Sequence, residues 1–307
     1  MKIFNWTYLF ILFSLCWSGC SNSGSPQNGA KGDQEDVLKG SMRVGVDETV
    51  LPLFLENKEV FESSYYNATI VPQPAAEVHA INSLIKGETS FAVLARELTP
   101  EESKSFEQRS IKPFIYPIAY DGIVLVTNNA SADTSFAIAD VIALLKGEQV
   151  KDVKLVFDNV NSSVLRYFKD LGAIDKIAGN YIEIQTSSEA VLNEVANSVE
   201  KIGFVSFNQY LFLKSSFKEL DKIRILSVLN DKGGKRRYVK PSQASLSTDE
   251  YPLKREIFAL NYQPNFGLGV GFSAFLTGDR GQRIVLKSGL LPVTMPGREI
   301  IIRDRIN

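Results

Sequence analysis

Cysteine and histidine are almost absent from this chain of 307 residues. Its two cysteines, Cys16 and Cys20, both lie near the N-terminus, and His79 is the only histidine. The remainder of the chain therefore has no disulfide and no cysteine-ligated metal site. Because His, Asp and Glu also show no metal-site spacing, we expect neither a metal nor a cofactor.

An excess of charge of either sign is also missing. Lys and Arg number 34 against 35 for Asp and Glu, which gives a net charge of −1. Proteins that hold nucleic acid need a positive field, so we expect no nucleic-acid partner. The 44% of hydrophobic and 22% of charged residues are typical of a folded soluble body, and the length suffices for one large domain or two lobes.

Motifs of common enzyme classes are lacking as well. The sequence contains neither a G-x-S-x-G nucleophile elbow nor a P-loop, and the glycine-rich stretch 267–271 lacks the G-x-G-x-x-G spacing of dinucleotide sites. A hydrolase would have to use His79, which falls on a predicted amphipathic helix where a packed or surface histidine is the simpler interpretation. We therefore expect a protein that is not an enzyme, with a His79-dependent hydrolase as the weakest alternative.

The one strongly apolar run is short and lies at the N-terminus. Residues 8–17 follow Lys2 and are too few to span a bilayer, which is typical of a signal peptide. The segment 17–20 (WSGC) resembles a bacterial lipobox, so we predict a signal peptide over 1–19 and lipidation of Cys20, with plain secretion or an uncleaved anchor as alternatives. Residues 20–40 are rich in Ser, Gly and Asn and are predicted to form a flexible tether.

Short apolar runs alternate with amphipathic stretches over residues 41–307. Strands are predicted at 43–46, 69–71 (ending at Pro72), 91–94, 123–127, 153–157, 181–185, 204–206, 223–229 and 255–260, and helices at 51–61, 77–86, 137–145, 163–171, 189–201, 271–276 and 282–287. The polar stretch 230–250 is predicted to be a long loop or hairpin. This alternation predicts an α/β fold with mainly parallel sheets, divided into two lobes.

Two predicted strand-to-helix turns carry polar side chains suited to an anion. The first contains Glu48 and Thr49, and the second contains Asn161, Ser162 and Ser163. Free backbone N–H groups and the positive end of the dipole at a helix N-terminus attract an anion, and hydroxyl groups can donate to it. Each turn taken alone is equally consistent with a simple helix cap formed by Thr49 or Ser162.

Arginine side chains supply a third candidate group. Arg96 follows the predicted strand 91–94 and could donate two hydrogen bonds to an oxyanion, or it could form a surface salt bridge. Arg166 lies one turn into the helix that starts at Ser163 and points either towards the same site or into solvent.

Several segments, in this order, resemble the phosphate-binding proteins of phosphate ABC transporters, which are PstS-like proteins of the type II periplasmic binding protein family, here of the Bacteroidetes type. The resemblance covers roughly residues 41–303. The matching segments are 45–49 (GVDET), 95–102 (ARELTPEE), 118–123 (IAYDGI) with 127–128, 158–163 (DNVNSS), 202–206 (IGFVS), 251–255 (YPLKR), 281–285 (GQRIV) and 289–292 (GLLP).

The resemblance implies a two-lobed α/β fold with two crossover strands and a ligand cleft. Lobe I would comprise 41–127 and 236–307, and lobe II would comprise 128–235. It further implies a monomeric, periplasmic, lipid-anchored protein that binds inorganic phosphate or a similar anion without metal and delivers it to an ABC permease. By position, Thr49 matches the hydroxyl of the first loop and Ser162 the serine that starts the helix of the second lobe.

The sequence departs from the family pattern at three positions. Arg96 stands in the loop where better-known members carry a proton-accepting Asp, Asp158 replaces an Arg, and Val164 replaces a Thr. Asp121 could supply the missing acceptor or could serve only in a turn. The alternative function is therefore a binding or sensor protein of the same fold for another oxyanion or a small carboxylate, without transport.

Overall fold

The computed structural model of the protein describes residues 37–234 and 236–297. The predicted signal peptide, Cys20 and most of the predicted tether lie outside the described residues and stay predictions. None of the helices in the described ranges is both long and apolar enough to cross a membrane.

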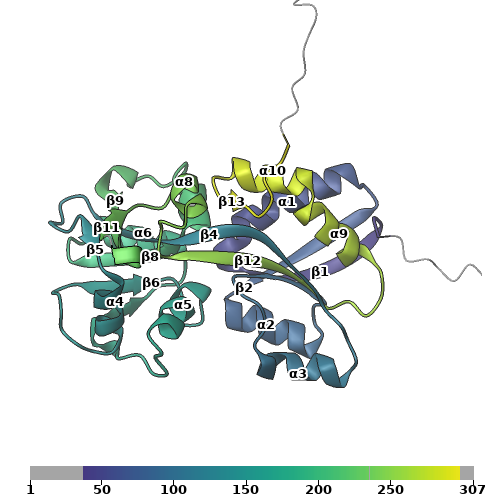
Figure 1. Ribbon diagram of the computed structural model, residues 1–307, viewed down its shortest axis with the longest axis horizontal. Helices are drawn as coiled ribbons and strands as arrows, with labels where there is room; N and C mark the ends of the chain where they lie inside the picture. The colour runs from purple at the N-terminus through teal and green to yellow at the C-terminus, as the bar shows by residue number, and fades with distance from the viewer. Residues whose placement is uncertain (1–36, 235, 298–307) are drawn as a thin grey trace, which may run out of the picture. The chain divides into compact units, whose positions relative to one another are not determined.

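The first lobe is built around three neighbouring parallel strands. β1 (Gly40–Asp47) lies between β2 (Ala68–Ala75) and β3 (Phe91–Leu94). Helices lie on both sides of these strands in Figure 1. They are α1 (Leu51–Ser64), α2 (Glu77–Lys86), α3 (Pro100–Gln108), α9 (Leu268–Thr277) and α10 (Asp279–Lys287), with the short strand β13 (Leu291–Pro292) after them.

The second lobe repeats this arrangement with its own parallel core. β6 (Lys154–Phe157) pairs in parallel with β7 (Ile182–Ile184) and β8 (Lys201–Ser206). A small separate sheet consists of β5 (Ser135–Phe136), β10 (Ser227–Asn230) and β11 (Arg237–Val239). The lobe also contains β9 (Ile223–Ile225) and the helices α4 (Ile138–Leu145), α5 (Ser163–Leu171), α6 (Ser188–Ala196) and α7 (Phe207–Leu213), and α8 (Gln243–Ser247) follows β11.

Two long antiparallel strands join the lobes. β4 (Phe114–Asn128) pairs with β12 (Lys254–Asn261) over its first part and with β8 and β9 over its last part. Figure 1 shows β4 and β12 running side by side from one lobe to the other. The predicted two-lobed α/β fold with two crossover strands is confirmed, although six of the eleven strand pairs are antiparallel rather than mainly parallel. The predicted lobe boundaries near 127 and 235 stay predictions.

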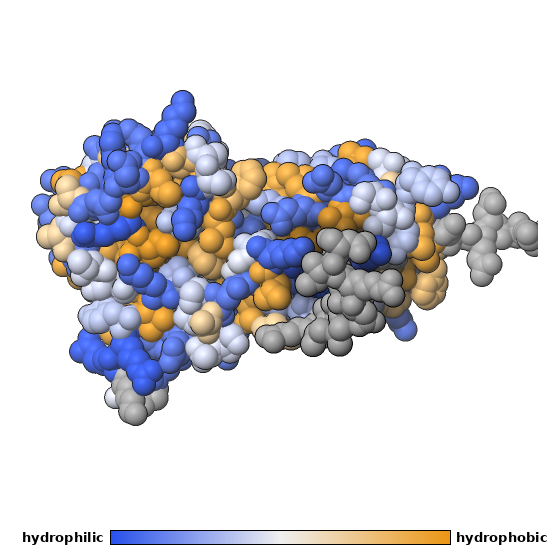
Figure 2. Space-filling model, turned by 90° about the horizontal axis from the view of Figure 1, so that it is seen from above, coloured by the Kyte–Doolittle hydropathy of each residue, from blue (hydrophilic) through white to orange (hydrophobic). Residues whose placement is uncertain are grey.

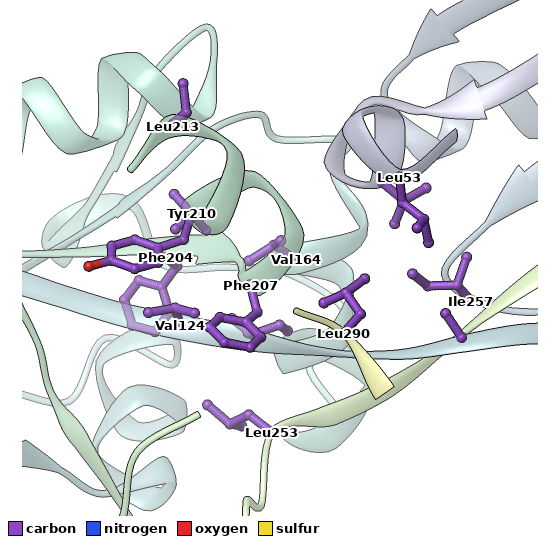
Figure 3. Close-up of a cluster of buried hydrophobic side chains, with 14 of the residues drawn as sticks. Leu53, Val124, Val164, Phe204, Phe207, Tyr210, Leu213, Leu253, Ile257 and Leu290 are labelled. Carbon is purple, nitrogen blue, oxygen red and sulfur yellow. The ribbon is translucent and has the colours of Figure 1, made fainter. Parts of the chain in front are cut away.

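The hydrophobic core continues through the region where the lobes meet. In Figure 3, Leu53 and Ile257 from the first lobe lie on one side of this region, and Phe204 and Val164 from the second lie on the other. Removing such side chains from water supplies most of the favourable free energy of folding. On the face seen in Figure 2, hydrophobic residues form patches separated by hydrophilic ones.

Several predicted element boundaries differ from the structure, and two of the differences have clear reasons. The strand predicted to stop at Pro72 continues to Ala75 through a second proline, because β2 is an edge strand whose prolines need not donate to a neighbour. The helix predicted over 189–201 ends at Ala196, and Lys201 already belongs to β8. Its valine periodicity is misleading, because Val199 lies beyond the helix and is 49% exposed.

Two short helices were not predicted at all. The apolar run 207–213 follows β8 directly and forms α7, capped by Ser206, whose hydroxyl accepts from the N–H of Gln209 at 2.9 Å. Within the stretch predicted to be a loop or hairpin, β10 and β11 do form an antiparallel pair, but Ser242 then caps α8. The segment predicted as one strand over 223–229 is interrupted at Leu226, which separates β9 from β10.

Gly203 marks the tightest contact between α6 and the sheet. A Cβ at this position would lie 2.7 Å from Val191 and 2.8 Å from Val195. We expect Gly203→Ala to lower the free energy of unfolding by about 1–3 kcal/mol, because the side chains around it must move. Urea unfolding measures this loss, and Gly179→Ala is the control because a Cβ there meets nothing within 4 Å. Equal losses in both variants would contradict the packing argument.

Candidate functional site

The two polar turns predicted from the sequence meet between the lobes. Thr49 lies between β1 and α1, and Ser163 is the first residue of α5. The hydroxyl oxygens of these two side chains are 2.9 Å apart, and both residues are fully buried. Because Thr49 belongs to the first lobe and Ser163 to the second, this contact joins the two lobes.

A buried arginine from a crossover strand holds both hydroxyl groups. Arg255 on β12 donates from Nη2 to Thr49 Oγ1 at 3.0 Å and from Nη1 to Ser163 Oγ at 2.8 Å. Both hydroxyls accept from the guanidinium and one of them donates to the other, so one hydroxyl proton remains available for another acceptor. Arg255 belongs to a segment that resembles the phosphate-binding family, but it was not predicted as a site residue, because its partners are remote in the chain.

Asp121 neutralises this arginine from the neighbouring crossover strand. Its Oδ2 accepts from Nε and Nη2 of Arg255 at 3.0 and 2.8 Å, and its Oδ1 accepts from the N–H of Asn208 at 3.0 Å. Burial alone would lower the pKa of Arg255, but the adjacent Asp121 carboxylate raises it above the usual value. Asp121 is therefore part of the site, whereas the predicted alternative of a turn residue is wrong because it lies within β4.

The backbone of Thr49 is fixed by two further buried side chains. The N–H of Thr49 donates to Asp47 Oδ1 at 3.0 Å, and the hydroxyl of Ser206 donates to the carbonyl oxygen of Thr49 at 2.6 Å. Thr49 is not a helix cap, since Val50 occupies the N-cap position of α1 and forms no side-chain cap. The second oxygen of Asp47, Oδ2, is buried and has no hydrogen-bond partner.

Ser162 and Asn161 occupy different positions from their neighbour Ser163. Ser162 caps α5, because its hydroxyl accepts from the N–H of Leu165 at 3.3 Å. The side-chain nitrogen of Asn161 lies 3.5 Å from Nε2 of His79 on α2. Asn161 and Ser162 therefore lie next to Ser163 in the chain, but neither takes part in the hydrogen bonds that connect Arg255 with its partners.

Arg96 is occupied by carboxylates of its own lobe. Its Nη1 and Nη2 donate to the two oxygens of Glu102 at 2.7 and 2.8 Å, and its Nε donates to Glu77 at 3.3 Å. The salt bridge that was predicted as the alternative to anion binding by Arg96 is thus observed. Arg96 also lines a cavity of about 600 Å³ together with Arg166 and Arg255. Arg166 joins the lobes, because it donates from α5 to both oxygens of Glu77, in one case at 3.2 Å.

Glu48 faces a second, smaller cavity, where it lies close to Asp158. Asp158 follows β6 and is 2% exposed, and its Oδ1 has no hydrogen-bond partner. Burial, together with the nearby Asp47 and Glu48, raises the pKa of Asp158 to about 6, against the effect of a hydrogen bond with Ser162. The sequence indicated Glu48 as a site residue but gave Asp158 no role of its own.

The raised pKa of Asp158 makes stability depend on pH. The folded state holds this proton more tightly than the unfolded state, so folding loses stability as the pH rises from about 4 through 6. We expect Asp158→Asn to raise the free energy of unfolding by roughly 2–3 kcal/mol at pH 7.5, and to have little effect near pH 4. Urea titrations at several pH values test this, with Asp175→Asn on the exposed surface as the control. A gain that is equal at all pH values would contradict the assignment.

Comparison with known proteins identifies the family. The model of the PBP superfamily domain matches residues 27–280. The phosphate-binding protein PstS of Staphylococcus epidermidis is 25% identical over 251 residues, which cover 75% of this chain and 71% of the relative.

Two solved structures agree in fold. One, from Clostridium perfringens, is assigned as a phosphate ABC transporter substrate-binding protein with bound phosphate, and it superposes with a TM-score of 0.67 at 18% identity over 83% of this chain and 100% of that chain. An ABC-type phosphate transport receptor from Vibrio cholerae gives 0.64 at 18% identity, over 82% and 100%. By its match to the family model over most of its length, the chain belongs to the PBP superfamily, in which it is PstS-like.

Proposed function

We propose that this protein binds phosphate between its two lobes and delivers it to an ABC permease. The observation that carries the proposal is the convergence of the Thr49 and Ser163 hydroxyls on the guanidinium of Arg255. The hydroxyls come from opposite lobes, and each lies at the start of a helix, where backbone N–H groups and the helix dipole favour an anion. The PstS relative and the two phosphate transport proteins of the same fold support phosphate as the anion.

The site suits an oxyanion without any metal ion. Arg255 brings a planar set of donors and the hydroxyls bring neutral ones, while Asp121 cancels the charge of the arginine. Affinity then comes from the number and direction of hydrogen bonds rather than from net charge. We infer that His79 has no catalytic task and that the protein is not an enzyme.

We assign to Asp47 the role of proton acceptor, because this chain has Arg96 in the loop where the family pattern has an accepting Asp. Its Oδ1 is used by Thr49, but its Oδ2 is buried and unpartnered beside the site. A phosphate that still carries a proton can donate that proton to Oδ2. A fully ionised sulfate has no proton to donate, so one of its oxygens would face the negatively charged Oδ2 of Asp47 and be repelled. The site would therefore bind phosphate more tightly than sulfate.

The position of the protein in the cell follows from its N-terminus. We propose that the signal peptide over 1–19 is removed, that Cys20 is lipidated, and that the following tether over 20–40 holds the binding domain on the periplasmic side of the membrane. A lipid anchor would keep the domain close to the permease, to which it would deliver phosphate as a monomer.

Adjacent serines with different contacts test the location of the site. We expect Ser163→Ala to weaken phosphate binding by about 10–100-fold, because a donor to the anion is lost and Arg255 Nη1 loses its partner. Ser162→Ala removes a helix cap instead, so it should lower the free energy of unfolding by about 0.5–2 kcal/mol and change affinity less than threefold. Calorimetry and urea unfolding separate the two effects, and the opposite ranking of affinities would place the anion elsewhere.

Ligand identity is tested by calorimetry on protein stripped of bound ligand by reversible unfolding. Phosphate and arsenate should bind with micromolar affinity or better, which corresponds to about −8 kcal/mol, and sulfate and small carboxylates should bind far more weakly. Asp47→Asn should narrow the gap between phosphate and sulfate, because an amide can donate to sulfate. Tight binding of a carboxylate without phosphate binding would instead favour a sensor or binding protein for another anion.

A further inference from the structure

Carboxylates from both lobes surround one small cavity beside the anion site. The cavity has a volume of about 190 Å³, and its lining includes Glu48 from the first lobe and Asp158 and Glu189 from the second. Asp47, at the end of β1, raises the pKa of both Glu48 and Asp158 and therefore lies within their electrostatic reach. Closing the lobes thus brings acidic groups of like charge together.

The hydrogen bonding of these acids is incomplete on both sides. Asp158 Oδ2 accepts from the hydroxyl of Ser188 at 3.4 Å, but Oδ1 has no partner. Asp47 Oδ2 is also unpartnered, and both residues are at least 98% buried. A buried, unpartnered carboxylate oxygen is costly when ionised and becomes much less costly when it carries a proton.

No positive side chain lines this cavity to offset the acids. The other lining residues are Ser187 and Ser188 at the start of α6 and Gln209 and Leu213 on α7. His79 on α2 is the one basic group that affects the pKa of Glu48, which it lowers as the weakest of four causes. Among the residues that the structure describes, no group of three or more acidic, His or Cys side chains could hold a metal ion. A proton on one of these carboxylates would reduce the repulsion within the cluster.

We propose that Asp158 takes up a proton when the lobes close, so that closure, and with it anion binding, is favoured at lower pH. The first lobe contributes Asp47 and Glu48, and the second contributes Asp158. Opening the lobes would separate these groups and admit water, which returns Asp158 to the ionised form of an ordinary exposed carboxyl. The proposal rests on the proposed function only in that the lobes open and close around a ligand.

Hydrogen bonds between the lobes give the scale against which this charge acts. They include Thr49 with Ser163, Glu77 with Arg166, and the N–H of Leu53 with the side-chain oxygen of Asn208 at 3.2 Å. The net stabilisation from one such hydrogen bond is similar in size to the change in the stability of the closed form that we expect when Asp158 loses its proton. With a pKa of about 6, Asp158 changes from the protonated to the ionised form between about pH 5 and pH 8, so any effect on lobe closure falls in this interval.

The distance between the lobes gives a test that needs no ligand. Cysteines introduced by Lys104→Cys on α3 and Lys176→Cys after α5, both exposed, can carry spin labels in the full chain once Cys16 and Cys20 are changed to Ser. We expect the ratio of closed to open protein to fall about tenfold between pH 5 and pH 8, because one carboxyl with a pKa of about 6 in the closed form loses its proton in this interval.

Two variants isolate Asp158 as the responsible group. Asp158→Asn is neutral at every pH and should give a closed fraction that does not change with pH, whereas Asp175→Asn removes an exposed charge of the same lobe and should behave as the parent. Calorimetry with phosphate adds a second readout. Between pH 5 and pH 8, the affinity of the parent for phosphate should fall about tenfold more than that of Asp158→Asn. The titration of phosphate itself affects both proteins equally, so it cancels in this comparison.

The outcomes separate this inference from the proposed function. A lobe distance that is independent of pH, or an equal pH dependence in the parent and Asp158→Asn, would overturn the proton coupling even if phosphate binds tightly. If phosphate neither binds nor shifts the distance at any pH, while the pH dependence persists and Asp158→Asn removes it, the coupling stands and the phosphate assignment fails.

Discussion

The buried ion pair between Arg255 and Asp121 is the constraint on which the rest of the site depends. A guanidinium that is only 4% exposed is tolerable only with a carboxylate and further acceptors around it. Asp121 supplies the charge, and Thr49 and Ser163 supply the remaining acceptors. Because the pair lies on the two crossover strands, the charge that gathers the hydroxyls sits where the lobes meet.

This arrangement explains why each lobe contributes only part of the site. The first lobe holds Thr49 through Asp47, and the second lobe adds Ser206, which donates to the backbone of the same residue. The hydroxyl of Ser163 meets Arg255 only when α5 is close to β12. The geometry of the donors therefore depends on how the two lobes meet. Under the proposed function, closing the lobes on an anion would complete the site.

Local sequence signals predicted the turns correctly because their chemistry is local. Strands β1 and β6 are apolar runs, and a polar turn follows each before a helix with regular apolar spacing, so the turns that contain Thr49 and Ser163 could be placed from spacing. Spacing did not distinguish Ser163 from Ser162, which the resemblance favoured as the helix-start serine of the site. The two-lobed fold followed from the alternation of such elements and from the resemblance. The boundaries were less reliable where a pattern continued past its element, as at Val199 beyond the end of α6.

The remaining site residues could not be predicted because their partners are remote in the chain. Arg255 and Asp121 are 134 positions apart, and no periodicity indicates that their strands are neighbours. Arg96 was predicted to bind an anion, yet one of its partners was visible in the sequence. Thr99 and Glu102 have the spacing of a capping box, which the structure contains, and this places the Glu102 carboxylate next to Arg96. Glu77, its other partner, comes from a different helix.

The charges around the site also bear on how an anion can leave it. Arg255 is neutralised by Asp121, Arg96 by Glu102, and Arg166 by Asp170 on its own helix, so these three arginines would keep a carboxylate partner once the lobes separate. An anion bound by directed hydrogen bonds loses the donors of one lobe upon opening, and the nearby acids then repel it. A site that depended on net positive charge would keep its attraction in the open form. Under the proposed function, the acidic surroundings therefore favour release, while the converging donors provide capture in the closed form.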